Sequence, residues 1–266
     1  MKGPSKHSFR RGAQFRRRLA NAGRQPHIES GGVVLYGWHT VTAALANPAR
    51  RIRRLWATEN AARRLADEGI TLSTAPELVR PDTIAARLSP DAVHQGLLAE
   101  ADPLSAPELE DLTAAGIVLV LDQITDPHNV GAILRTAAAF AVAAIVTTAR
   151  HSPEATGVLA KSASGALEWV PIITVQNLAR ALAALKERGF LVVGLDSAGA
   201  DDLAALALTA PVALVLGAEG KGLRQGTRAA CDRLARLDLP GAIKSLNVSN
   251  AAALGLYIAS RALVPS

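Results

Sequence analysis

Apolar and polar positions along the chain form two successive patterns of short strands alternating with helices. The first pattern follows residues 1–32, which lack apolar periodicity, end in Ser-Gly-Gly and are expected to be disordered. The apolar segments of this first pattern predict strands at 33–35, 51–57, 70–73 and 95–99, and helices at 39–46 and 60–68.

The second pattern begins at Gly116 with an uninterrupted apolar run, 117–121, of the kind that forms strands buried on both faces. Further strands are predicted at 144–147, 171–175, 190–195 and 212–216, and helices at 129–140, 154–164, 177–188 and 247–263. Strands alternating with helices predict an α/β fold whose parallel sheet is covered on both faces.

These patterns divide the chain into four parts. We expect a basic tail (1–32), a small α/β domain (33–101), a linker (102–114) and a larger α/β domain (115–266). The linker contains Pro103 and Pro107, which disfavour both helix interiors and central strands.

The composition agrees with helices packed on a parallel sheet. Hydrophobic residues make up 49% of the 266 residues but aromatic residues only 3%, so that Ala, Val and Leu must fill the core. Cys231 is the one cysteine, which excludes an intramolecular disulfide and argues against a cysteine-ligated zinc site. The Ala-rich surroundings of Cys231 favour core packing over a nucleophilic role. The six histidines and the acids show no metal-ligand spacing, so no metal is expected.

The positive charge is concentrated at the N-terminus. Residues 1–30 hold eight of the 29 lysines and arginines and one of the 23 acids, so they contribute +7 to a net charge of +6. Such an arm fits a polyanion such as RNA, because neutralising phosphates releases counterions. A solubilising leader is the alternative, and the salt dependence of RNA binding after deletion of residues 1–30 would distinguish the two. No apolar run reaches the roughly 20 residues of a membrane span, and no secretory signal is present, so we expect a cytoplasmic protein with no membrane partner.

Three polar segments follow predicted strands, where parallel sheets bind ligands. The first, LDQITDPHNVGAILRT (121–136), runs from a buried strand through a turn into a helix, with Asn129 as a plausible N-cap. Arg135 stands among apolar residues, where a cation needs a partner or access to solvent. Structural pairing of Arg135 with Asp122 or Asp126 and a functional role are equally compatible with this spacing.

The second segment, GAEGKGL (217–223), places glycines after a buried strand, where the backbone can approach a ligand closely. Its spacing fits neither a Walker A loop nor a dinucleotide fingerprint, and a plain tight turn is an equal alternative. The third segment, 237–251, is an irregular loop that leads through Ser245 and Asn247 into an Ala-rich helix. Simple helix capping, by Ser249 or Asn250 above all, is the alternative to ligand binding there.

Taken in this order, the three segments resemble the signature motifs of the SpoU (TrmH-type) family of SPOUT methyltransferases over about residues 117–260. The first domain resembles the small substrate-binding domain of bacterial 23S rRNA guanosine-2′-O-methyltransferases, through residues 35–41, 43–45 and 94–97.

The resemblance implies a trefoil-knotted α/β domain that works as a homodimer, with the final helix at or near the interface. It implies S-adenosylmethionine as methyl donor, bound by Gly217, Leu237, Leu246, Leu195 and Ser245. Leu237 belongs to the sequence Leu237-Asp238-Leu239, which departs from the Ile-Pro-Met usual in the family.

The resemblance also assigns the activation of a ribose 2′-hydroxyl to Arg135, supported by Asn129, Glu219 and Asn247. An arginine is an uncomfortable base, because a guanidinium holds its proton strongly, so that Arg135 could instead hold an RNA phosphate. The implied function is 2′-O-methylation of a ribose, a guanosine in 23S rRNA being favoured. A tRNA ribose methyltransferase and a non-catalytic RNA-binding protein that retains the knot are the alternatives. A nicotinamide-dependent oxidoreductase is not favoured, because the chain lacks the dinucleotide-binding fingerprint of that class.

Overall fold

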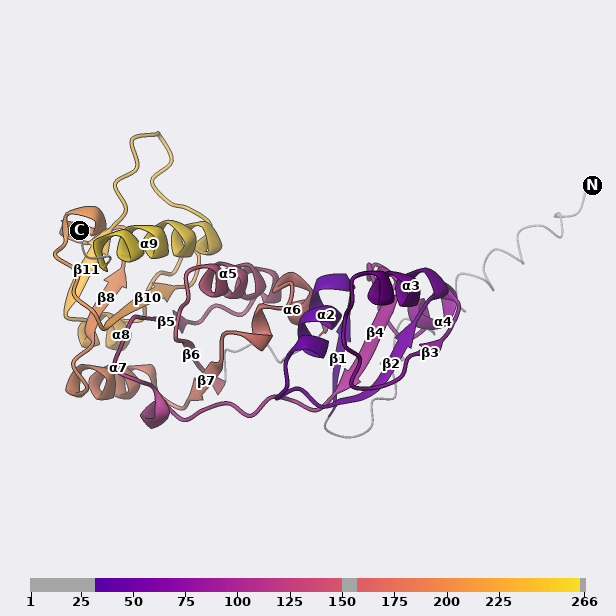
Figure 1. Ribbon diagram of the computed structural model, residues 1–266. Helices are drawn as coiled ribbons and strands as arrows, with labels where there is room; N and C mark the ends of the chain where they lie inside the picture. Colours follow the sequence, from indigo (N-terminus) through magenta and orange to yellow (C-terminus); the bar gives the residue numbers. More distant parts are fainter. Residues whose placement is uncertain (1–31, 150–156, 264–266) are drawn as a thin grey trace, which may run out of the picture.

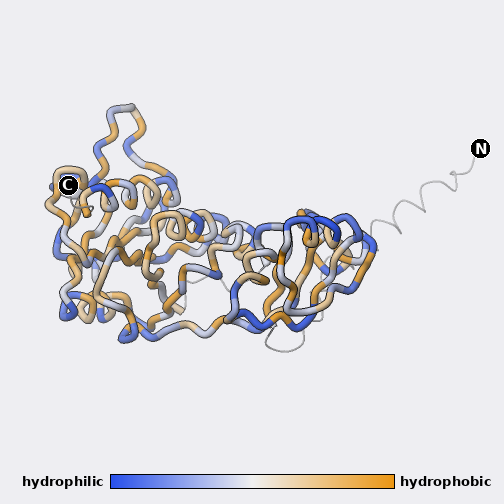
Figure 2. Tube along the Cα trace, in the orientation of Figure 1, coloured by the Kyte–Doolittle hydropathy of each residue, from blue (hydrophilic) through white to orange (hydrophobic). Residues whose placement is uncertain are grey.

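A computed structural model describes residues 32–149 and 157–263, so the predicted tail lies outside the described residues except for Gly32. The chain forms two bodies side by side, each built around one sheet, and an extended segment connects them (Figure 1). Hydrophobic positions run along the strands inside both bodies, and hydrophilic ones concentrate in the outer loops (Figure 2).

The smaller body contains a four-stranded sheet in the order β1-β4-β2-β3, with β4 antiparallel to both β1 and β2 and with β3 parallel to β2. Its elements are β1 (Val33–Tyr36), α2 (Trp38–Ala46), β2 (Ile52–Ala57), α3 (Glu59–Asp67), β3 (Glu77–Leu78), α4 (Pro81–Ala85) and β4 (Leu97–Ala101). Helix α3 begins where the Thr58 side chain accepts a hydrogen bond from the backbone N–H of Ala61, and it buries Leu65 against the sheet.

The predicted strand at 70–73 is wrong, because the edge strand is β3, a few residues later. Leu72 is 38% exposed. The Glu77 carboxylate pairs with Arg54 at 2.9 Å and accepts a hydrogen bond from Trp56 Nε1 at 3.1 Å. Polar contacts with β2 therefore determine which residues form the edge strand. A pattern of apolar residues cannot predict such polar contacts.

The larger body contains a seven-stranded sheet in the order β7-β6-β5-β10-β8-β11-β9, and every recorded strand pair in it is parallel. The strands are β5 (Ile117–Asp122), β6 (Ala144–Thr148), β7 (Ile172–Val175), β8 (Leu191–Leu195), β9 (Asp201–Asp202), β10 (Val212–Gly217) and β11 (Arg233–Arg236). The predicted parallel α/β fold is confirmed. The knot stays a prediction.

Helices cover both faces of this sheet, as the continuous apolar run of β5 requires. Ile117, Leu119 and Leu121 point into one hydrophobic core, and Val118 and Val120 into the other. One face carries α5 (Pro127–Ala139), α6 (Gly157–Ser162) and α9 (Val248–Leu263), and the opposite face carries α7 (Leu178–Glu187) and α8 (Gln225–Ala230) (Figure 1). Short 3-10 turns complete the fold at η1 (Leu109–Asp111), η3 (Ala166–Glu168) and η4 (Leu203–Ala205).

The sequence pattern did not predict α4, α8, β9 or β11, which are short and rich in polar residues. Part of the predicted helix 154–164 lies in 150–156, outside the described residues. Cys231 packs as predicted, with its thiol donating to the Thr227 carbonyl at 3.3 Å, and burial raises the pKa of this thiol to about 11. No helix among the described residues is long and apolar enough to cross a membrane.

Helices α5 and α6 approach closely because Gly131 has no side chain. A Cβ atom on Gly131 would lie 2.3 Å from Ser162 Cβ and 2.9 Å from the Ala163 backbone nitrogen. The Ala163 contact is backbone, so it cannot move aside easily.

Gly131→Ala should therefore lower the melting temperature. Overpacking costs about 1–3 kcal/mol, more than the roughly 1 kcal/mol that alanine gains over glycine in a helix. Gly226→Ala in α8 is the control, because a Cβ there has nothing within 4 Å; it should leave the melting temperature unchanged or raise it. Equal effects of the two substitutions in thermal denaturation would contradict the packing account.

Candidate active site

The ends of three neighbouring parallel strands bring the predicted site together. Strand β10 pairs with β5 so that Gly217 lies beside Asp122, and it pairs with β8 so that Leu216 lies beside Leu195. Because parallel strands end at the same edge, the loops that follow β5, β8 and β10 gather there. The loop between β11 and α9 extends away from the body above this edge (Figure 1).

A hollow of about 400 Å³, the β8–β10 hollow, lies among the segments that follow β8, β10 and β11 and those that precede α9. Five of its lining residues are those that the family resemblance assigned to the cofactor: Leu195, Gly217, Leu237, Ser245 and Leu246. They come from four separate parts of the chain. The geometry therefore brings together all five predicted residues.

Gly217 is required by the turn that closes this hollow. The chain folds back so that the Gly222 N–H donates to the Ala218 carbonyl at 2.8 Å, and a Cβ on Gly217 would lie 2.2 Å from the Gly222 carbonyl carbon. The tight-turn alternative thus describes this segment, and the turn also forms part of the wall of the hollow. Contact with a ligand stays a prediction.

A second hollow of about 430 Å³, the β5–β10 hollow, adjoins the first, and Ala218 and Glu219 line both. Its other lining residues follow β5 or belong to α5 and the glycine loop: Gln123, Ile124, Thr125, Asp126, Asn129 and Lys221. Gln123 has a φ of 61°, an uncommon conformation for a residue other than glycine, and sequence reasoning did not single it out.

Three of the four predicted catalytic residues meet at the beginning of α9. Asn247 Nδ2 donates to Asn129 Oδ1 at 3.0 Å, and the Val248 N–H donates to Glu219 Oε1 at 3.4 Å. Asn247 Oδ1 also accepts from the Ser249 N–H at 2.8 Å, so Asn247 caps α9 instead of Ser249 or Asn250.

Arg135 does not join this group. Its side chain is exposed, it lines neither hollow, and within the described ranges 32–149 and 157–263 it has no recorded hydrogen bond or ion pair. Six residues after Asn129, it stands about 9 Å further along α5. Among the described residues, the predicted support of Arg135 by Glu219 is therefore not a direct contact.

Two structural expectations for the first segment are wrong. Asn129 is not the N-cap of α5: the cap is Asp126, whose carboxylate accepts from the His128 N–H at 3.0 Å. Nor does Arg135 pair with Asp122, because the fully buried Asp122 carboxylate accepts from Arg224 Nε at 2.7 Å and from the Arg224 backbone N–H at 3.0 Å.

The Asp122–Arg224 pair is a structural part of the site that sequence reasoning missed. It ties the end of β5 to the residue after the glycine loop, and so fixes both ends of the segment that carries Glu219. An acid at the end of a buried apolar run was the available signal, because such a group needs a partner. The sequence could not identify Arg224 as that partner.

The chain is similar to known proteins over both bodies. The model of the SpoU rRNA Methylase family matches residues 116–257. The chain belongs to the SpoU rRNA methylase family. A second model, described as RNA 2′-O ribose methyltransferase substrate binding, matches residues 34–107.

Two curated relatives match most of the chain. The 23S rRNA (guanosine-2′-O-)-methyltransferase RlmB of Pseudomonas putida is 39% identical over 85% of this chain and 95% of its own length. The protein of that name from Ralstonia nicotianae is 38% identical over 88% of this chain and 98% of its own length.

Solved structures share the fold. The SpoU methyltransferase AviRb of Streptomyces viridochromogenes, in complex with AdoMet, aligns over 94% of this chain and 97% of its own, with a TM-score of 0.74 and 23% identity. An AdoMet-bound rRNA methyltransferase of Sinorhizobium meliloti aligns over 89% and 90%, with a TM-score of 0.74 and 22% identity. At these identities the likeness establishes the arrangement of the chain.

Among the residues that the structure describes, no group of three or more His, Cys, Asp or Glu side chains could hold a metal ion.

Proposed function

We propose that this protein transfers a methyl group from S-adenosylmethionine to the 2′-hydroxyl of a guanosine in 23S rRNA. The proposal rests on one observation above all: the five residues assigned to the cofactor line one hollow, and Glu219 belongs to both that hollow and its neighbour. The names of the two RlmB relatives supply the substrate, and both cover most of this chain. An enzyme acting on ribosomal RNA would work in the cytoplasm.

The β8–β10 hollow fits the donor. Leu195, Leu237 and Leu246 provide apolar contacts for an adenine ring, and Gly217 leaves the space that a side chain would fill. When bound, the donor supplies a methyl group on a sulfonium, which is already an activated electrophile. The protein therefore has to hold the donor, orient the ribose and help the hydroxyl proton leave.

The β5–β10 hollow suits the acceptor nucleotide, because it shares a wall with the donor hollow. Asn129 is held by Asn247, so both amides have fixed orientations near that wall. They can orient a ribose by hydrogen bonds. Glu219, at the boundary between the hollows, offers a carboxylate that can accept a proton or a hydrogen bond.

Arg135 fits a phosphate-binding role better than a base. An exposed guanidinium with no partner among the described residues is free to bind a phosphate through two parallel hydrogen bonds. Since it lies along α5 from Asn129, a phosphate bound there would hold the RNA strand beside the acceptor hollow.

Arg135→Ala should bind S-adenosylmethionine with unchanged affinity but lose methyl transfer to 23S rRNA by about 10²-fold or more, because the ribose is no longer held in place. Calorimetry measures the first quantity, and incorporation of labelled methyl groups followed by mapping of 2′-O-methyl sites measures the second. Arg135→Lys, which keeps the charge without the planar fork, should retain intermediate activity. Near-normal turnover of Arg135→Ala would refute the assignment, and methylation of tRNA alone by the native protein would overturn the substrate.

Gly217→Ala should weaken binding of S-adenosylmethionine by at least about tenfold, because opening the turn around a new Cβ deforms the hollow that it closes. The Gly226→Ala protein is the matched control, since it carries the same added methyl group on a helix that lines neither hollow, where a Cβ has nothing within 4 Å. Equal donor affinity of the two variants in calorimetry would argue against the placement of the donor.

We also propose that the protein is a homodimer assembled through α9. Leu254 and Tyr257, three residues apart on this helix, are 36% and 55% exposed, and residues at this spacing share a helix face. Replacing both by Asp should yield monomers in sedimentation equilibrium, because burying two charges opposes association. A native protein that sediments as a monomer at micromolar concentration would disprove the dimer.

A further inference from the structure

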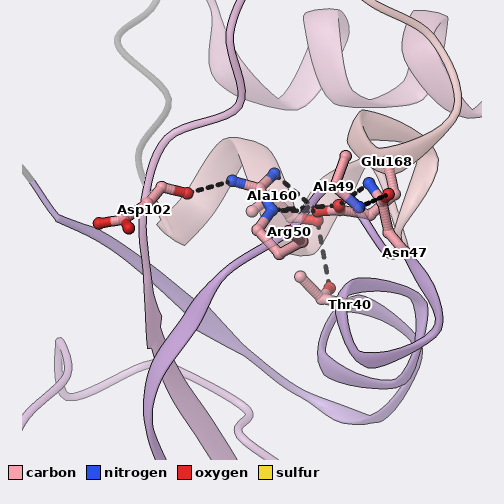
Figure 3. A network of polar contacts seen from close by, with 7 residues as sticks. All are labelled: Thr40, Asn47, Ala49, Arg50, Asp102, Ala160 and Glu168. Carbon is pink, nitrogen blue, oxygen red and sulfur yellow. Dashed lines mark hydrogen bonds and ion pairs between the residues drawn. The ribbon is translucent and has the colours of Figure 1, made fainter. Parts of the chain in front are cut away.

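A buried polar network centred on Glu168 joins the two bodies (Figure 3). Arg50, in the loop between α2 and β2, donates from Nη2 to Glu168 Oε1 at 2.7 Å, and Asn47 Nδ2 donates to Glu168 Oε2 at 2.8 Å. The Arg50 and Glu168 side chains are only 5% and 2% exposed. Arg50 Nη1 also donates to the Asp102 carbonyl at 2.7 Å, so the network includes the start of the segment that connects the bodies.

The packing around this network makes α6 and η3 part of both bodies. Ala160 belongs to the hydrophobic core of the small body, and the Thr40 hydroxyl donates to its carbonyl at 3.2 Å. Lys161 Nζ donates to Gln95 Oε1 at 2.9 Å. A Cβ on Gly165 would lie 2.6 Å from Ala43 Cβ, which leaves no space for sliding.

The same α6 packs directly on the helix that carries Asn129. Gly131 of α5 contacts Ser162 and Ala163, and the Ser162 hydroxyl lies 3.3 Å from His128 Nδ1. A continuous set of packed contacts therefore leads from Arg50 through α6 to the beginning of α5, where the acceptor hollow starts.

Stability alone gives no reason for a buried ion pair at such an interface, because apolar residues of similar volume often stabilise as well or better. A bidentate arginine–carboxylate pair adds directionality: it permits one relative orientation and penalises others. Interfaces between domains of one chain are mobile by default. A buried network such as that of Glu168 opposes such motion, because separating the bodies would leave both charges without a partner.

We propose that Arg50 and Glu168 are positioning residues that hold the RNA-binding body at one fixed orientation to the two hollows. This rests on the proposed function. RNA held by the small body then presents one nucleotide to the methyl donor, and the network determines which nucleotide that is. Neither residue lines the β5–β10 or the β8–β10 hollow.

Glu168→Gln removes the charge of the pair with little change of shape. It should leave the affinity for S-adenosylmethionine unchanged and the KM for the rRNA fragment nearly so. The kcat at the native site should fall about 10- to 100-fold, since small misplacements of reacting groups have effects of this size. Mapping of the product should reveal methylation of neighbouring riboses. Glu68→Gln is the matched control: it removes the carboxylate of an exposed pair with Arg64 in the small body and should change none of these quantities.

The orientation itself can be measured without activity. One spin label is placed on each body at an exposed position, through Asn60→Cys in α3 and Glu187→Cys in α7, in a protein that also carries Cys231→Ala. Double electron–electron resonance should then give one narrow distribution of distances between the two labels. Glu168→Gln should broaden that distribution. Arg50→Lys, which keeps the charge but loses the bidentate geometry, should broaden it less, and it is the decisive variant if Glu168→Gln does not fold.

An unbroadened distribution together with a single methylated site and native kcat in Glu168→Gln would overturn the inference. A native protein that methylates no rRNA would instead overturn the proposed function, and the distance measurement would still test the positioning role.

Discussion

Strand β10 lies between β5 and β8, parallel to both, in a register that sets Gly217 beside Asp122 and Leu216 beside Leu195. Parallel strands must end at the same edge, so this register alone brings together loops that are up to about a hundred residues apart in sequence. A shift by one residue would reverse the faces of β10 and move the glycine turn off the hollow. The buried Asp122–Arg224 pair and the packing of Gly217 on Gly222 prevent such a shift at the end where the site is built.

A second constraint lies outside the sheet. An RNA strand has to lie in a defined position relative to the two hollows. The body matched by the substrate-binding model is, however, built around a separate sheet. Helix α6 resolves this difficulty because it is packed on two sides: Ala160 enters the small core, and Ser162 and Ala163 meet Gly131 of α5. One short helix thus contacts both the small body and the helix α5 that carries Asn129.

The sequence predicted what depends on local apolar patterning and missed what depends on specific polar pairs. The run 117–121 defined the central strand because burial on both faces requires every position to be apolar. Strand β11, Arg-Leu-Ala-Arg, was not predicted because an arginine at each end interrupts the apolar pattern of a half-buried strand. Strand β3 was not predicted because its place depends on the contacts of Glu77 with Arg54 and Trp56. For the site, the ordered motifs singled out five residues that line the β8–β10 hollow. They could not show that Asp122 pairs with Arg224 and leaves Arg135 in solvent, since that depends on which cation reaches a buried carboxylate in three dimensions.

The charges that line the two hollows do not tell donor from acceptor, but the charge outside them favours one direction of approach for the RNA. A sulfonium donor is a cation and an RNA acceptor is an anion, so they need surroundings of opposite sign. Each lining carries two acids and one lysine: Asp196, Glu219 and Lys244 in the β8–β10 hollow, and Asp126, Glu219 and Lys221 in the β5–β10 hollow. Arg135 stands beyond it on α5, exposed to solvent. RNA phosphates would be repelled from both linings and attracted to Arg135 outside them, so that the strand would approach along α5 with its ribose towards Glu219. In that orientation Arg135 would bind the RNA backbone without entering either hollow, so its exposure agrees with the phosphate-binding role that we propose.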